Sequence, residues 1–292
     1  QKLLNTDNTK CQISKTNSNL KLNHPCLLRQ GVEISRNQSF IACIADIYGD
    51  MISEGLTINK MREKLIESLT LDNYITLQNG NLNIYFGEEI EESEIDISMY
   101  RDSNLFKLID ESNLEQLTFF INAVKSFNKF KEFLSSKSEI IDYTYLWDLI
   151  CTPNPKLFES GVNLIIIELL DEDITDNINI ICPSNHFSNE FFDVNKKTIV
   201  LLKNEEYYEP IYIFTDTNRS IKIKKTFNIN DIDLIPEFKE SLIFIKNMMI
   251  SNCAPFPSLP KVYEFKKSNT LKITSRLTSQ NDMCATVCIL QA

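Results

Sequence analysis

The hydrophobic period changes along this chain, and that change most constrains its fold. Between residues 39 and 133 most apolar side chains recur at helical spacing, whereas short apolar runs typical of strands begin at Val162 and continue to residue 214. A further helical pattern covers residues 230–251. Helices first, a block of strands next and a late helix predict an α+β fold, or a three-layer α/β/α arrangement.

Three helices are predicted before the strands. The first begins at Ser39 and ends at Gly49, and the second starts near Thr57. The third covers residues 114–133, where the many phenylalanines indicate a helix packed on a core rather than a ligand pocket. Ser39 is a candidate N-cap of the first helix, since a serine hydroxyl can accept a hydrogen bond from a free N–H of the first turn.

A β-hairpin is predicted between the second and third helices. The stretch "YITLQNGNLNIYFG", residues 74–87, alternates between apolar and polar side chains around Asn79-Gly80. This dipeptide is a strong hairpin signal. The later strands are predicted at residues 162–170, 177–183, 197–203 and 208–214.

A chain of 292 residues with 43% hydrophobic residues can bury a sizeable core. Residues 1–26 are polar and predict an irregular lead-in, residues 27–252 predict one globular domain, and residues 253–292 predict a proline-containing linker and tail. Because the sequence begins with Gln1 rather than Met, we expect a fragment of a longer protein.

The charge balance excludes some partners. The net charge is −10, from 30 basic and 40 acidic residues, so nucleic acid is not expected as a partner, while a basic protein partner is compatible. The one locally basic run, residues 222–225, indicates a solvated strand edge. No apolar stretch reaches the length of a membrane span, so no membrane partner is expected.

Eight cysteines are spread without a CxxC pair, which favours free thiols in a reducing, intracellular compartment. Cys284 and Cys288 lie four positions apart without a nearby histidine, so no zinc site is predicted, and no cofactor is expected.

Two histidines, His24 and His186, limit the catalytic chemistry that the chain can perform. Any cysteine or serine mechanism that uses an imidazole base must recruit one of them. A nucleophile could be Cys43, one turn inside the first helix, or Cys182. A serine such as Ser39 needs both a general base and an oxyanion hole before it can attack a substrate.

One stretch is similar to a known active site. The sequence "NQSFIACIADIYG" resembles the nucleophile segment of the ovarian-tumour (OTU) deubiquitinases, in which Asp-Gly-Asn-Cys leads into a "RAIAD"-like helix. In this alignment the family's cysteine falls at Ser39, and its Asp-Gly-Asn falls at Arg36-Asn37-Gln38.

Three further segments resemble the family in the same order. "NKMREKLIESLTLDNYITL" is similar to its next helix, and "YLWDLICTPNPKLFESGVNLIIIEL" to a helix led by an aromatic residue, here Trp147, before a core strand. "KTIVLLKNEEYYEPIYIF" resembles the closing hairpin, where Tyr207 takes the histidine position, Tyr208 the tyrosine and Glu209 the acidic position. The resemblance covers about residues 27 to 215 and implies a papain-related fold with a small central sheet flanked by helices.

The resemblance implies the fold of the family without its catalytic residues. Ser39 replaces the thiol and Tyr207 the imidazole, and a phenol with an ordinary pKa near 10 is a poor base at neutral pH. We therefore expect a catalytically inactive OTU-like module that binds a protein, ubiquitin or another viral protein, or serves as a structural part of a larger viral protein. The Asn, Ile and Lys bias is similar to that of large giant-virus proteins, which would place the chain in the host cytoplasm or the virion.

Two alternatives remain open. The first is an active, deubiquitinase-like cysteine hydrolase that uses a displaced pair, Cys43 or Cys182 with His186 or His24. The second is a structural virion or assembly component that no longer contacts ubiquitin.

Overall fold

The computed structural model describes residues 23–29, 31–87, 95–169, 179–184, 187, 190–217 and 220–253. The predicted tail, most of the predicted lead-in, and His186 lie outside the described residues. The described residues form two compact units, one made of residues up to Leu69, from Lys131 to Ser184 and from Glu190 to Cys253, and one made of Thr70–Phe130 together with Phe187.

The first unit contains every strand of the sheet and the helices that cover it. Its elements, in chain order, are β1 (Cys26–Arg29), α1 (Ser39–Ile52), α2 (Ile58–Ser68), α7 (Tyr143–Cys151), β2 (Val162–Leu169), β3 (Asn179–Ile180), β4 (Lys197–Asn204), β5 (Tyr207–Thr217), β6 (Ser220–Lys224) and α8 (Pro236–Asn252). The last turn of α6 (Leu114–Ser135) also belongs to this unit.

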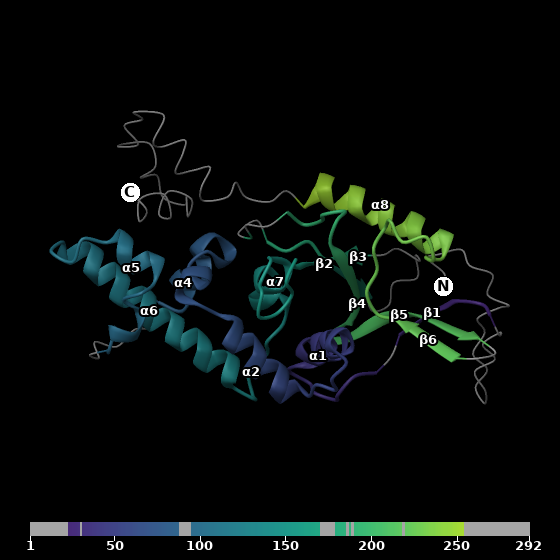
Figure 1. Cartoon of the computed structure of the whole chain (residues 1–292), viewed down its shortest axis with the longest axis horizontal. Helices are drawn as coiled ribbons and strands as arrows, with labels where there is room; N and C mark the ends of the chain where they lie inside the picture. Colours follow the sequence, from purple (N-terminus) through teal and green to yellow (C-terminus); the bar gives the residue numbers. More distant parts are fainter. Residues whose placement is uncertain are drawn as a thin grey trace. The chain divides into compact units, whose positions relative to one another are not determined.

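The six strands form one mixed sheet with the order β1-β5-β4-β2-β3, and β6 pairs with β5 (Figure 1). β2 and β4 run parallel over eight residue pairs, from Val162 opposite Lys197 to Leu169 opposite Asn204. Every other pairing is antiparallel. A mixed sheet with helices confirms the predicted α+β class.

The core of this unit is built around β2. Residues 162–166 are consecutively buried, so both faces of the strand are covered, as expected for the interior of a sheet flanked by helices. Figure 1 shows α7 and α8 on opposite sides of β2. Trp147 of α7, the only tryptophan of the chain, is fully buried and lies edge-on to Phe191 with ring centroids 6.1 Å apart.

The first two predicted helices are confirmed, with one shifted end. α1 begins at Ser39 as expected but continues past Gly49 to Ile52, and Ser53 ends it in a left-handed conformation with φ of 57°. α2 follows Thr57, whose hydroxyl accepts a hydrogen bond from the Lys60 N–H. The apolar spacing predicted both starts, whereas the glycine did not end the helix, which continues for three exposed residues.

The second unit is helical. It contains α3 (Leu71–Tyr74), the 3₁₀ turn η1 (Leu77–Gly80), α4 (Asn81–Tyr85), the 3₁₀ turn η2 (Ser98–Tyr100), α5 (Asn104–Leu108) and α6 up to Phe130. The predicted packing of α6 is confirmed, because Phe127 and Phe130 are buried and their rings lie 5.2 and 5.3 Å from the ring of Tyr74.

The hairpin predicted at Asn79-Gly80 is wrong. Both residues have positive φ, 54° and 86°, as a hairpin turn would require, but they join η1 to α4. A capping box at Thr70 starts α3 just upstream, and the buried Tyr74 hydroxyl then bonds to the Leu82 carbonyl oxygen and to Ser126. Packing on α6 therefore decides the local structure against the alternating pattern.

Candidate functional site

Ser39, which the resemblance aligned with the family's nucleophile, is the first residue of α1. The expected N-cap role is wrong, however, because Gln38 occupies the cap position and no side chain caps the helix. Ser39 itself is only 2% exposed. Its hydroxyl points away from its own helix and into the first unit.

The Ser39 hydroxyl is bonded to the main chain of the β4–β5 hairpin. Its Oγ accepts a hydrogen bond from the Tyr208 N–H at 3.1 Å and donates one to the Glu206 carbonyl oxygen at 3.4 Å. The structure thus brings together the two segments that the resemblance aligned with the family's nucleophile and base segments. They meet through backbone groups of the strand.

Tyr207, at the family's base position, and its neighbour Tyr208 differ in their surroundings. Tyr207 is the first residue of β5 and is half-buried. Tyr208 is buried, lies edge-on to Phe40 with centroids 5.3 Å apart, and donates its hydroxyl to Asp142 at 3.2 Å. Burial, and then the Asp142 carboxylate, raise the pKa of Tyr208 far above its ordinary value. Tyr208 therefore stays protonated and cannot act as a base.

Glu209, at the family's acidic position, contacts neither Ser39 nor Tyr207 among the interactions of the described residues. Its carboxylate pairs with Arg29 of β1 at 3.4 Å, and both side chains are partly exposed. An exposed pair of this kind contributes little to stability. It joins β5 to its neighbour strand rather than orienting a catalytic group.

The loop before α1 is fixed by contacts that sequence analysis missed. The Gln38 amide donates to the Ser136 carbonyl oxygen at 2.7 Å, and the Asn37 amide donates to that of Ser138. The Asn37 carbonyl oxygen in turn accepts from the Ile141 N–H at 3.2 Å. Polar side chains immediately before a buried helix were the available signal, but their partners lie about a hundred positions away along the chain.

Cys43, the first alternative nucleophile, is completely buried. Burial, and then the carboxylates of Asp46 and Glu209, raise the pKa of its thiol well above the ordinary value. A buried, protonated thiol cannot attack a substrate.

Cys182, the second alternative, forms a disulfide with Cys253. The expectation of free thiols is therefore wrong for this pair, and Cys26 is also disulfide-bonded. Cys43 and Cys151 are the free cysteines among the described residues. Of the candidate bases, His24 is half-buried just before β1. Even spacing of cysteines along a sequence cannot reveal which of them meet in the fold.

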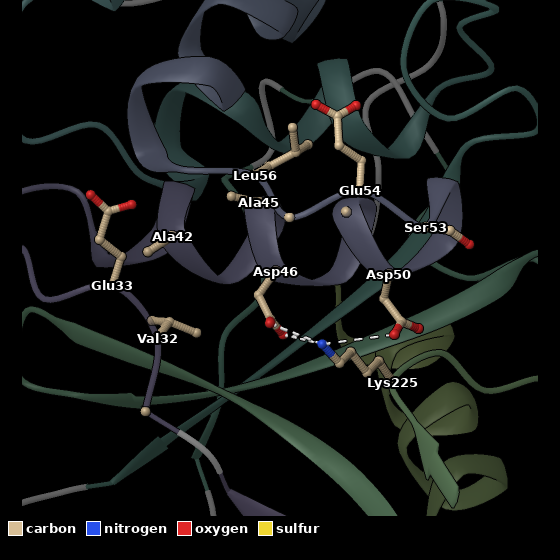
Figure 2. A pocket seen from close by; sticks show the side chains of 13 residues that line it. Val32, Glu33, Ala42, Ala45, Asp46, Asp50, Ser53, Glu54, Leu56 and Lys225 are labelled. Atoms are coloured by element: carbon tan, nitrogen blue, oxygen red, sulfur yellow. Dashed lines mark hydrogen bonds and ion pairs between the residues drawn. The ribbon is translucent and has the colours of Figure 1, made fainter.

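A groove of about 510 Å³ runs along α1 on the side of Ala42, Ala45 and Gly49 (Figure 2). These small residues leave the space open. A Cβ atom on Gly49 would lie 2.4 Å from the Glu54 carbonyl oxygen, so the chain after α1 passes too close to this position for a larger residue.

Four carboxylates line this groove, from Glu33, Asp46, Asp50 and Glu54, with the single lysine Lys225. In Figure 2 Asp46 and Asp50 point from α1 toward the ammonium group of that lysine.

The lysine compensates only part of this negative charge. Its Nζ lies 2.9 and 3.0 Å from the two carboxylate oxygens of Asp46 but 3.9 Å from Asp50, which is half exposed. Asp46 also accepts from the Tyr212 hydroxyl. The predicted strand edge at residues 222–225 is thus exposed along β6, whereas Lys225 turns inward.

The other two carboxylates border the groove on its outer sides. Glu33 accepts from the Ile58 N–H at 2.7 Å, at the start of α2, and Glu54 pairs with Lys60 at 3.3 Å. Both side chains are exposed. Among the described residues that line it, the groove therefore has four carboxylates and one lysine, and Lys60 beside it compensates Glu54, so its potential is negative.

No metal-binding cluster and no membrane-spanning helix occur in the described residues. No group of three or more His, Cys, Asp or Glu side chains there could hold a metal ion. None of the helices in that part of the chain is long and apolar enough to cross a bilayer.

Comparison with known proteins gives one distant relative. The chain is 24% identical over 190 residues to an uncharacterized protein of Acanthamoeba polyphaga mimivirus, a match that covers 60% of this chain and 10% of that protein. The chain thus corresponds to about a tenth of the length of that giant-virus relative. No protein-family model and no solved structure matches it.

Proposed function

We propose that this chain is a catalytically inactive, OTU-like binding or structural module of a larger viral protein. The observation that carries the proposal is the Ser39 hydroxyl, which is 2% exposed and uses both its proton and its oxygen on the main chain of the β4–β5 hairpin. A serine nucleophile must be accessible to a substrate and must pass its proton to a base, whereas this hydroxyl is buried and donates its proton to a main-chain carbonyl oxygen.

The OTU-like part of the proposal is supported by the arrangement of the segments. Ser39 and Tyr208 lie 169 positions apart, yet they meet through a hydrogen bond where α1 and β5 begin. The resemblance puts the family's nucleophile at Ser39 and its base at Tyr207, the residue next to Tyr208. The distant relationship to a giant-virus protein supports the viral context.

The active-hydrolase alternative has little support among the described residues. Cys43 is buried with a raised pKa, and Cys182 is part of a disulfide. Neither sulfur is a thiolate with access to a substrate.

For the partner, the acidic groove beside α1 favours a protein segment that carries a positively charged side chain. The four carboxylates of the groove outnumber the two lysines that pair with them, Lys225 and Lys60, so the groove attracts a cation, and the net charge of −10 steers basic partners toward the chain. Ubiquitin is the first candidate to test, and another viral protein is the second.

The test is a titration of the protein with ubiquitin by NMR or calorimetry, using two charge reversals. Asp50→Lys reverses a charge inside the groove, and Glu63→Lys makes the same change on the exposed face of α2. We expect Asp50→Lys to weaken binding by about tenfold, or ~1.4 kcal/mol, and Glu63→Lys to leave it nearly unchanged. Equal effects of both changes would show that only the net charge matters, and absence of binding would exclude ubiquitin as the partner.

Inactivity is tested separately with ubiquitin that carries an electrophile at its C-terminus. The unmodified protein should form no adduct by mass spectrometry. An adduct on any cysteine would contradict the proposal and support the active-hydrolase alternative.

A further inference from the structure

The disulfide between Cys182 and Cys253 joins two elements that are far apart in sequence. Cys253 is the residue that ends α8, and Cys182 lies two residues after β3, at the edge of the sheet. The two cysteines are separated by 71 positions. The bond therefore fixes the C-terminal end of α8 to the sheet beside which it lies (Figure 1).

The remaining contacts of α8 are apolar. Phe238, Leu242, Ile245 and Met249 form its buried stripe. Phe238 packs edge-on against Phe227 with centroids 4.8 Å apart, which holds the N-terminal turn of the helix.

Polar contacts do not hold the helix in place. Within the described residues no hydrogen bond or ion pair joins the side chains of α8 to the sheet, and the Ser241 and Ser251 hydroxyls bond within the helix or to the residue that follows. At the C-terminal end of α8, the disulfide is thus the one bond among the described residues that joins the helix to the sheet, in addition to apolar packing.

The two sulfurs differ in access. Cys182 is exposed, whereas Cys253 is buried at 4% exposure. A reductant can approach the bond from the Cys182 side, and the terminal turn of a helix opens more readily than its centre. Reduction would leave Ile245 and Met249 covered only by apolar packing.

We propose that Cys182–Cys253 is a redox-sensitive clasp that holds the C-terminal half of α8 on the sheet. A thiolate of a small dithiol attacks one sulfur of the disulfide and displaces the other as a thiolate. The second thiol of the reductant then displaces the protein from the mixed disulfide. The protein gains two thiols, and the dithiol becomes a cyclic disulfide, so two electrons and two protons are transferred to the protein.

Opening the clasp would enlarge an apolar surface that is already exposed. Phe244 and Ile250, on the outer side of α8, are 68% and 57% exposed. When the end of the helix leaves the sheet, Ile245 and Met249 join them. The redox state would therefore change how much apolar surface this side of the first unit presents.

The test is hydrogen exchange of the full chain, measured by mass spectrometry after equilibration with glutathione disulfide or with dithiothreitol. Peptide mapping of the oxidised sample should recover the Cys182 and Cys253 peptides linked to each other. We expect exchange at residues 247–252 to accelerate by at least about tenfold on reduction, while α1 stays unchanged.

The double variant Cys182→Ser/Cys253→Ser is the control. This variant retains the disulfide of Cys26, so any change in hydrogen exchange that the reductant still causes comes from reduction of that bond. The variant should show fast exchange at residues 247–252 in both samples. Unlinked peptides in the oxidised wild-type sample, or equal exchange of α8 in its two states, would overturn the proposal even if the variant does not fold.

Discussion

Removal of the Ser39 hydroxyl should destabilise the first unit more than an ordinary serine-to-alanine change. In Ser39→Ala the Tyr208 N–H loses the acceptor that it reaches at 3.1 Å, and the Glu206 carbonyl oxygen loses a donor. Consecutive residues of a β-strand direct their N–H groups to opposite edges, so pairing with β4 does not supply another acceptor for Tyr208.

The magnitude follows from burial. Ser39 and Tyr208 are both only 2% exposed, so water does not replace the lost bond. A buried N–H without a partner costs about 1–3 kcal/mol. Helix propensity favours alanine over serine by less than that, roughly 0.5 kcal/mol. We expect a net loss of about 2 kcal/mol, which lowers Tm by about 6 °C for a unit of this size.

Trp147 supplies the assay. It is the only tryptophan of the chain and lies buried in the first unit, so its fluorescence in urea reports the unfolding of that unit. The matched control is Ser241→Ala, where a half-buried serine of α8 bonds to the Glu237 carbonyl oxygen of its own helix. The control should change stability by less than about 0.5 kcal/mol. An equally small change in Ser39→Ala would refute the proposed role of its hydroxyl.

Three further predictions concern other parts of the fold. Tyr74→Phe removes a buried hydroxyl that bonds to a carbonyl oxygen and a serine, and should cost the helical unit about 1 kcal/mol, measured by circular dichroism during thermal unfolding. Gly161→Ala should prevent folding of the first unit, seen as solvent-exposed tryptophan fluorescence, because its φ is +67° and a Cβ atom would lie 2.2 Å from the Cys151 carbonyl oxygen. The hydrogen bond from Lys203, at 2.7 Å, lowers the pKa of Glu168 below its ordinary value, so this pair stabilises the fold above the unfolded pKa and loses that contribution as pH falls through the folded one. Urea titrations below about pH 4.5 should therefore show a smaller acid-induced loss of stability in Lys203→Met than in the wild type.

The sequence predicted an element correctly where its hydrophobic pattern was regular and its apolar side chains were all buried. The stripe that begins at Ser39 and the continuous apolar run after Val162 each match an observed element, because burial of these side chains leaves little choice of conformation. The alternation around Asn79-Gly80 failed because alternation describes a half-exposed strand, whereas these apolar residues pack on a neighbouring helix.

The contacts of Ser39 could not be predicted from the sequence. The resemblance aligned Ser39 and Tyr207 with the family's nucleophile and base, whereas the partners of the Ser39 hydroxyl are main-chain groups, which carry no sequence signal. The acidic groove was likewise not visible, because its carboxylates and Lys225 are separated by well over a hundred positions. The link between Cys182 and Cys253 was missed for the same reason.

The most direct measurement restores the two missing catalytic groups. The double variant Ser39→Cys/Tyr207→His should be incubated with ubiquitin that carries a C-terminal electrophile, beside an active OTU deubiquitinase as a positive control, and analysed by intact mass. Because position 39 is 2% exposed and lies against the main chain of β5, the account predicts no adduct on the variant. An adduct at position 39 would contradict it, since the site would then be an open active site that lacks only its two side chains.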